Sequence, residues 1–326
     1  MHAIRTERLR KQYGAEVIAV DGIDLTVDEG EMFAFLGPNG AGKTTTVRML
    51  TTLLRPTSGS ATVAGFDLRR DPHAIRRSIG VALQEAGLDQ LSTGRELLQL
   101  QGQLCGLPTT YAKKRADEML ELVGLNEAAD RQVKTYSGGM KRRLDLASAL
   151  VHEPRILFLD EPTEGLDPAS RQAVWQEVQR LNQGGMTVFL TTHYLEEADR
   201  LADRVAIIDH GRVVAEGTPA ELKASVGSDV VTVQVGYGMV EHAKSLLSEL
   251  DDLLEIQTNH TSLTLFVAEG TQVVPHVIRL LDGANVHLGA VSVAQPSLDE
   301  VFLRATGSRL EGAAADGRED SGNGSH

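Results

Sequence analysis

Gly37-Pro-Asn-Gly-Ala-Gly-Lys-Thr-Thr45 is the stretch of this sequence that decides the fold. It satisfies the pattern G-x-x-x-x-G-K-[ST], in which glycines let successive backbone N–H groups turn toward one centre and surround phosphate oxygens. A helix that begins near Gly42 adds the positive end of its dipole to that centre. Lys43 is spaced to reach the β- and γ-phosphates of a nucleotide, and the Thr44 hydroxyl to bind Mg²⁺. The expected nucleotide contacts are Gly37, Pro38, Asn39, Gly40, Ala41, Gly42, Lys43, Thr44 and Thr45.

The residues on both sides of this loop support its interpretation as a phosphate-binding loop. Residues 32–36 (Met-Phe-Ala-Phe-Leu) form a short apolar run typical of a buried parallel strand, and residues 45–54 space their apolar side chains as a helix does. A strand, a phosphate loop and a helix therefore follow one another. On this evidence alone the loop fits any enzyme with a phosphate loop, including a kinase or a GTPase.

Composition narrows the class of protein. A chain of 326 residues predicts about two domains, and no apolar run approaches the ~18 residues that cross a bilayer. The first residues lack the apolar segment of a signal peptide, so we expect a soluble, cytoplasmic chain. A formal net charge of −13 argues against a nucleic-acid partner. The single cysteine, Cys105, excludes an internal disulfide, and we interpret it as a packed thiol.

The order of predicted elements indicates an α/β core with a helical insertion. Alternating runs at 4–9 and 23–27 predict antiparallel strands, and residues of about 85–150 have mostly helical patterns. Short apolar strands return at 156–159 and 187–190. We assign residues 1–226 to this nucleotide-binding domain.

A second unit follows near Gly227. Its predicted order of elements is β-α-β-β-α-β over roughly 70 residues, which is typical of a ferredoxin-like α+β sandwich. Residues 227–306 are therefore expected to form an accessory domain. Residues 307–326 are rich in glycine, alanine and acidic residues, and they are expected to be a disordered tail.

Two carboxylates follow the predicted strand at 156–159. Asp160, at the carboxyl edge of the sheet, can bind Mg²⁺ beside Thr44, and Glu161 can polarise a water for attack on the γ-phosphate. The alternative is a pair of solvated carboxylates before a proline turn. The nearby phosphate loop favours the catalytic interpretation.

An ordered set of motifs accompanies the phosphate loop. Gln84 comes first, Ser137-Gly138-Gly139 stands 23 residues before Asp160, and His193 follows the strand at 187–190. Between about residues 4 and 220 the chain resembles the nucleotide-binding subunit of an ATP-binding cassette (ABC) transporter. The resemblance implies a phosphate-loop ATPase fold with a mixed core sheet, an antiparallel β subdomain and a helical subdomain. It also implies ATP and Mg²⁺ as ligands.

The resemblance implies further roles. Ser137, Gly138 and Gly139 would face the γ-phosphate held by a second copy of the chain, so that a head-to-tail dimer encloses two ATP molecules. Asp167 would belong to the loop that crosses the dimer seam.

Three more roles are implied for single side chains. Gln84 would bind Mg²⁺ or the attacking water, His193 would hydrogen-bond the γ-phosphate, and Tyr13 would stack on adenine. The alternatives are a packed histidine for His193 and simple packing for Tyr13. Residues 141–143 (Lys-Arg-Arg) are interpreted as a solvated helix face or one that forms salt bridges between subunits.

A narrower resemblance rests on residues 296–303 (Pro-Ser-Leu-Asp-Glu-Val-Phe-Leu) and 136–145. Both are similar to drug-resistance exporter ATPases of the daunorubicin/doxorubicin type. This implies a motor subunit on the cytoplasmic face of the membrane, which powers efflux of a drug-like or lipophilic compound. A separate permease would dock near residues 85–110. Two alternatives remain: a soluble ABC ATPase of DNA repair or translation, and a switch whose C-terminal unit senses a small molecule.

Overall fold

The computed structural model describes residues 1–306, apart from residues 15, 85, 86, 227, 228, 237, 249, 251, 252, 260, 285, 295 and 296. Met1–Pro219 form one compact unit, and the described residues after Pro219 belong to a second. The expected tail and the two residues at the expected domain boundary lie outside the described residues. In the part of the chain that is described, no helix combines the length and apolar character of a membrane span.

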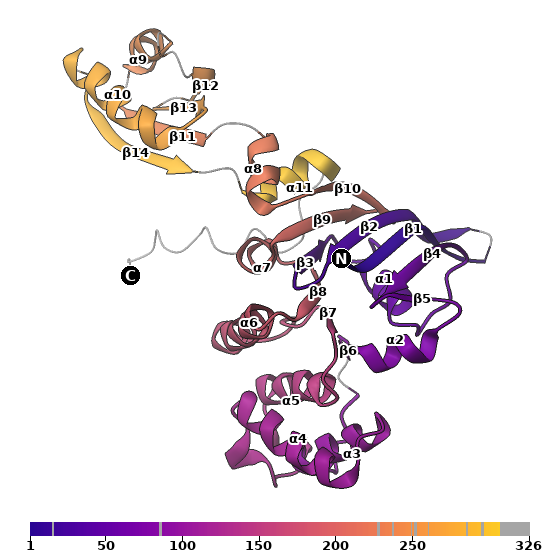
Figure 1. Cartoon of the computed structure of the whole chain (residues 1–326). Helices are drawn as coiled ribbons and strands as arrows, with labels where there is room; N and C mark the ends of the chain where they lie inside the picture. The colour runs from indigo at the N-terminus through magenta and orange to yellow at the C-terminus, as the bar shows by residue number, and fades with distance from the viewer. Residues whose placement is uncertain are drawn as a thin grey trace, which may run out of the picture. The chain divides into compact units, whose positions relative to one another are not determined.

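A six-stranded sheet forms the centre of the first unit (Figure 1). Its order is β10-β9-β3-β8-β7-β6, and all neighbours are parallel except β10 and β9. β3, β7 and β8 are buried along their whole length, as strands covered on both faces should be. The strands are β3 (Met32–Leu36), β6 (Ile79–Ala82), β7 (Ile156–Asp160), β8 (Thr187–Thr192), β9 (Arg204–Asp209) and β10 (Arg212–Gly217).

Four phenylalanines pack against one face of this sheet. The ring centroid of Phe189 lies 5.5 Å from those of Phe33 and Phe158 and 5.8 Å from that of Phe35. All four side chains are fully buried. Phe189 is therefore the shared neighbour that joins three adjacent strands of the sheet.

An antiparallel sheet of order β2-β1-β4-β5 covers the same core. Its strands are β1 (His2–Tyr13), β2 (Val17–Asp28), β4 (Ser58–Val63) and β5 (Phe66–Asp67). Ile4, Leu9 and Ile23 are buried, whereas Arg5 and Asp24, which follow two of them, are exposed. The predicted antiparallel β subdomain is confirmed.

The helical insertion contains α3 (Gly94–Leu104), α4 (Thr109–Leu122) and α5 (Gly138–Leu150), with short 3-10 turns at Asn126–Ala128 and Val133–Thr135. α3 begins at a capping box, in which Thr93 and Glu96 satisfy each other's backbone N–H groups. Residues 105–108 separate α3 from α4.

Helices α1 (Lys43–Leu50), α2 (Pro72–Ser78), α6 (Pro168–Gln183) and α7 (Leu195–Leu201) complete this unit. Sequence patterns did not predict α2 and α7. Each has seven residues, which is too short for helical periodicity to stand out, so tertiary packing defines both.

The second unit has the predicted ferredoxin-like topology. Its sheet has the order β12-β13-β11-β14, and every neighbouring pair is antiparallel. The elements are α8 (Pro219–Val226), β11 (Asp229–Val235), α9 (Val240–Leu247), β12 (Leu253–Thr258), β13 (Ser262–Val267), α10 (Gly270–Gly283), β14 (Leu288–Ala294) and α11 (Leu298–Thr306).

The position of Phe189 predicts a large loss of stability when its ring is removed. Phe189→Ala should lower the free energy of unfolding by about 3–5 kcal/mol, because the surrounding rings cannot fill the cavity. Val17→Ala, at a side chain that is 59% exposed, should change it by less than about 0.5 kcal/mol. Urea denaturation of both variants tests this, and equal midpoints would contradict it.

Candidate functional site

The phosphate loop connects β3 to α1, and two of its glycines have no substitute. A Cβ on Gly37 would lie 2.3 Å from the carbonyl oxygen of Ile208. A Cβ on Gly42 would lie 2.3 Å from that of Ala19, and Gly42 has a φ of 109°, which other residues rarely adopt. The loop is thus pressed against neighbouring backbone, and the N–H groups of Gly37 and Ala41 donate to the carbonyl oxygens of Thr192 and Pro38, both at 3.2 Å.

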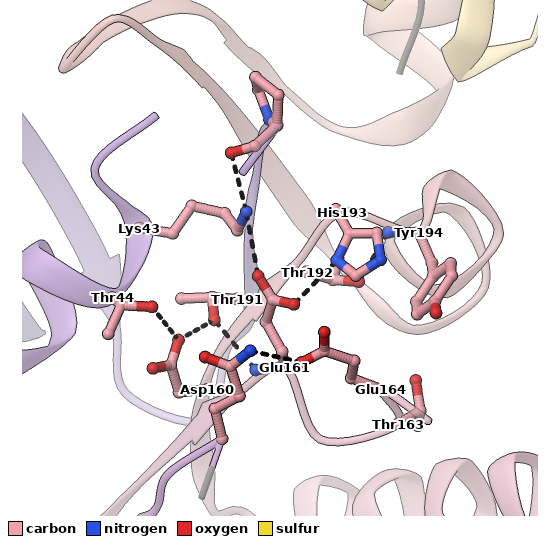
Figure 2. A network of polar contacts seen from close by, with 12 residues as sticks. Lys43, Thr44, Asp160, Glu161, Thr163, Glu164, Thr191, Thr192, His193 and Tyr194 are labelled. Carbon is pink, nitrogen blue, oxygen red and sulfur yellow. Dashed lines mark hydrogen bonds and ion pairs between the residues drawn. The ribbon is translucent and has the colours of Figure 1, made fainter. Parts of the chain in front are cut away.

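Lys43 holds a buried positive charge at the centre of this loop (Figure 2). Its Nζ donates to the carbonyl oxygens of Gly37 at 2.7 Å and Pro38 at 3.1 Å. It also forms an ion pair with Glu161, Nζ to Oε1 3.1 Å. Only 4% of Lys43 is exposed, so the carboxylate compensates a charge that water cannot reach.

Glu161 is the residue directly after β7, and its backbone is held in the left-handed region at a φ of 50°. Its N–H donates to the carbonyl oxygen and to the hydroxyl of Thr191, both at 3.1 Å. These bonds to β8 support a conformation that is costly for a residue with a side chain. They aim the carboxylate at Lys43 and His193.

The second carboxylate oxygen of Glu161 lies 2.8 Å from Nδ1 of His193. Because an ionised carboxylate only accepts hydrogen bonds, Nδ1 carries the proton. Burial raises the pKa of Glu161, but the hydrogen bond from His193 and the Lys43 charge outweigh it and hold the pKa below the usual value. Glu161 is therefore ionised at neutral pH.

Within the described part of the chain, Asp160 has a carboxylate oxygen without a hydrogen-bond partner beside the phosphate loop. Its Oδ1 accepts from Thr191 Oγ1 at 2.6 Å and from Thr44 Oγ1 at 3.3 Å. Its Oδ2 is buried and has no hydrogen-bond partner among the described residues. A buried carboxylate oxygen without a partner next to a hydroxyl suits a hard cation such as Mg²⁺.

Gln84 follows β6 by two residues, and its Nε2 donates to Glu164 Oε2 at 2.6 Å. A carboxylate can only accept, so this bond fixes the orientation of the Gln84 amide. Gln84 and Glu161 border the same cavity of about 290 Å³ as the phosphate loop. Its lining consists of Ala19, Asn39, Gly40, Gly42, Lys43, Thr44, Thr45, Gln84 and Glu161.

The residues predicted to lie at a dimer seam, Ser137 to Gly139 and Asp167, are not among the lining of this cavity. Ser137 caps the N-terminus of α5 and accepts from Met140 N–H at 3.2 Å, and Gly138 and Gly139 form the first turn. Asp167 caps α6 by accepting from Ser170 N–H at 3.0 Å, and these bonds lower its pKa. None of these side chains lines the cavity within one chain.

Tyr13 also lies outside the cavity lining. It ends β1, is 44% exposed, and has Nζ of Lys11 5.0 Å from its ring centroid. The ring is thus available for stacking, which stays a prediction.

Arg142 corrects one interpretation from the sequence. It is not part of a solvated helix face, because it is buried. Its guanidinium donates to the carbonyl oxygens of Leu83 at 2.5 Å, Pro162 at 2.7 Å and Asp160 at 3.1 Å. It also forms an ion pair with Asp145, Nη1 to Oδ2 3.1 Å. Burial raises the pKa of Asp145 to about 6, although the charge of Arg142 acts to lower it. Helical spacing is the sequence signal that could have found Arg142, because residues 142, 146 and 149 lie on one buried face of α5.

Glu197 is a second buried residue that sequence patterns did not single out. It lies on α7, is fully buried, and accepts from Trp175 Nε1 at 2.7 Å and Thr163 Oγ1 at 2.9 Å. Burial raises its pKa. Glu197 thereby connects the loop after Glu161 with α6 and α7.

Comparisons with known proteins bear on the family of this chain. Residues 20–164 match a family model described as ABC transporter, and residues 217–306 match one described as ATP-binding protein DrrA1-3-like, C-terminal domain. The chain is 47% identical to the daunorubicin/doxorubicin resistance ATP-binding protein DrrA of Streptomyces peucetius, with 94% of this chain and 92% of the relative covered. It is 37% identical to the linearmycin resistance ATP-binding protein LnrL of Bacillus subtilis, with 94% and 99% covered.

Solved structures are similar as well. The dimeric post-hydrolysis state of the ATP-binding cassette MJ0796, bound to ADP and Pi, has a TM-score of 0.61 and 27% identity, with 66% of this chain and 98% of that one covered. CbiO1 from Clostridium perfringens has a TM-score of 0.63 and 27% identity, with 76% and 96% covered.

The fold and the site, together with these similarities, define an ATP-hydrolysing ABC cassette. More narrowly, the chain belongs to the family of daunorubicin/doxorubicin resistance ATP-binding proteins, the ATP-binding subunits of drug-resistance ABC exporters. This membership favours transport over a role in DNA repair or translation.

The contacts of Arg142 predict a structural cost for its loss. Arg142→Met should lower the free energy of unfolding by about 3–5 kcal/mol, since it leaves buried Asp145 and three carbonyl oxygens without their donor. The neighbouring control Arg143→Met, which loses one carbonyl contact to Val123, should cost about 1 kcal/mol. Chemical denaturation measures the free energy of unfolding of both variants. Equal losses would show that the buried contacts of Arg142 do not stabilise the fold more than the single contact of Arg143.

Proposed function

We propose that this chain drives efflux of a drug-like or lipophilic compound through a separate permease, by ATP-dependent closure of two copies of the chain. The observation that carries the proposal is the division of the site. Lys43, Thr44, Glu161 and Gln84 border one cavity, whereas residues 137–139 begin a helix and are not among its lining residues. The names of the relatives, which refer to daunorubicin, doxorubicin and linearmycin, support the compound class.

Hydrolysis begins with an exchange of partners at Lys43. When ATP enters the loop, its β- and γ-phosphates compete with Glu161 for the Lys43 ammonium. Loss of that ion pair removes one cause of the low pKa of Glu161 and makes the carboxylate a better base. The nucleotide thereby prepares its own general base.

Glu161 then accepts a proton from a water molecule whose oxygen attacks the γ-phosphorus. The bond from phosphorus to the β,γ-bridging oxygen breaks, and ADP leaves with that electron pair. His193, held by Glu161 through Nδ1, keeps its Nε2 for the γ-phosphate. Thr44, Asp160 and the amide oxygen of Gln84 would hold Mg²⁺, which neutralises charge on the phosphate oxygens.

The second half of the site would come from another copy of the chain. Ser137 caps a 13-residue helix, and the first turn of such a helix leaves N–H groups free for an anion. Asp167 begins the neighbouring helix α6 and would lie at the same seam. The dimeric state of the related cassette MJ0796 supports this arrangement.

The permease would dock in an apolar groove between α3, α5 and β6, at the cytoplasmic face of the membrane. A cavity of about 310 Å³ lies there, and its lining includes Leu53, Val81, Leu83, Cys105 and Ala149. Two exposed leucines one turn apart on α3 directly precede the lining residues Gln101 and Cys105: Leu100 is 55% and Leu104 74% exposed. Because Leu83 precedes Gln84, a partner in the groove is one residue from the nucleotide cavity.

Replacement of the proposed base should separate binding from hydrolysis. Glu161→Gln should keep ATP binding but lower the rate of hydrolysis about 10²–10⁴-fold, since the amide cannot accept the proton. Glu121→Gln, at an exposed position on α4, is the control and should hydrolyse ATP normally. Hydrolysis by Glu161→Gln at the parental rate would show that Glu161 is not the base.

A charge placed at the end of α3, next to the groove residue Cys105, should disrupt the permease complex. Leu104→Glu should reduce capture of the permease from membranes about tenfold or more, because the carboxylate must be buried in an apolar contact. ATP hydrolysis by the isolated chain should not change. Leu254→Glu, at a similarly exposed leucine of β12, should capture the permease normally. Equal capture by the two variants would place the permease elsewhere.

A further inference from the structure

Arginines gather in one part of an otherwise acidic chain. Residues 48–77 contain six arginines and only two aspartates, although the whole chain has a formal net charge of −13. Three of these arginines, Arg55, Arg69 and Arg76, line a single cavity of about 460 Å³. No aspartate or glutamate is among the residues that line it. The cavity is therefore a concentrated positive site on a protein that anions should otherwise avoid.

The guanidinium groups of this cavity are open to a ligand. Within the described residues, none of the three arginines forms an ion pair, and Arg76 Nε only donates to the carbonyl oxygen of Pro72 at 3.2 Å. The nearby Asp67 accepts the backbone N–H groups of Arg69 and Arg70, both at 2.9 Å. Those bonds hold its pKa below the usual value, so it stays charged and offsets part of the local positive charge. The three positive charges of the guanidinium groups still exceed the one negative charge of Asp67.

The walls between these guanidinium groups are apolar. Leu54, Pro56 and Leu68 contribute to the lining, and Leu68 is buried. A guanidinium presents parallel N–H donors that match two oxygens of a phosphate, whereas the apolar wall favours hydrocarbon. The combination fits a ligand that has a phosphate and an apolar part in one molecule. A free inorganic anion would leave the apolar wall unused.

Arg76 also belongs to the lining of the apolar groove on α3, α5 and β6. The two cavities therefore adjoin. If the permease occupies that groove, as proposed above, the arginine cavity lies beside a protein that is embedded in the bilayer.

We propose that the cavity formed by Arg55, Arg69 and Arg76 binds the phosphate headgroup of an anionic phospholipid. The inference rests on the proposed docking of the permease for its location, but the binding itself requires only the chain and the lipid. Because the rest of the chain is repelled by an anionic surface, this cavity orients the subunit with the permease groove toward the bilayer.

Vesicle sedimentation with the full chain, without any permease, tests this. The wild-type chain should bind vesicles that contain phosphatidylglycerol and should bind pure phosphatidylcholine vesicles far more weakly. Arg55→Ala/Arg69→Ala should weaken binding to the anionic vesicles about 10- to 30-fold. The control Arg131→Ala/Arg279→Ala makes the same change in net charge at exposed positions outside the cavity and should bind nearly as the wild type does. Unchanged ATP hydrolysis confirms that the variants fold.

Three results would overturn the proposal. Equal binding to both kinds of vesicle would exclude headgroup recognition, and equal loss in both double variants would reduce the effect to net charge. Loss of permease capture by Arg55→Ala/Arg69→Ala without any effect on vesicles would assign the cavity to an acidic segment of the permease. None of these results alters the tests of Glu161 and Leu104, so failure here is distinguishable from failure of the proposed function.

Discussion

The ion pair between Lys43 and Glu161 is the interaction on which the rest of the site depends. The ammonium is almost fully buried, and its charge is compensated by one carboxylate and two carbonyl oxygens of the phosphate loop. A buried charge of this kind is stable only while its partners keep their positions. The glycines that let the loop approach neighbouring backbone and the bonds that hold Glu161 in a left-handed conformation serve this requirement. In the proposed reaction, a nucleotide would offer Lys43 a more highly charged partner than Glu161, so this ion pair would be the first contact to change.

Strand order brings the partners together. β8 lies between β3 and β7, so Thr191 at its end reaches both Asp160 and the backbone of Glu161. Residues from three separate parts of the chain thereby meet at one carboxyl edge, where open parallel sheets bind ligands. The helix that begins at Ser137 starts away from this edge. Within one chain, the start of this helix is therefore not part of the cavity that Lys43 and Glu161 line.

Arg142 joins this edge to the helical insertion. From α5 it binds the carbonyl oxygens of Leu83 and Asp160, which precede Gln84 and Glu161 respectively. A shift of α5 cannot leave those two side chains unmoved unless these bonds break. Leu83 also lines the apolar groove on α3 and α5, so a partner bound there, as proposed, would contact the residue that precedes Gln84.

The sequence by itself determined the features that depend on local spacing. Glycines at fixed intervals before Lys43, apolar strands that end in Asp160 or lead to His193, and the alternation of the C-terminal elements are all readable along the chain, and the phosphate loop, the core sheet and the ferredoxin-like unit agree with them. Only the tertiary structure decided which polar side chains are buried. Arg142 resembles its half-buried neighbours Lys141 and Arg143 in the sequence, and Glu197 lies in an ordinary acidic run, yet both are enclosed by segments distant along the chain. Burial of such groups depends on contacts between remote residues, and a one-dimensional pattern does not contain those contacts.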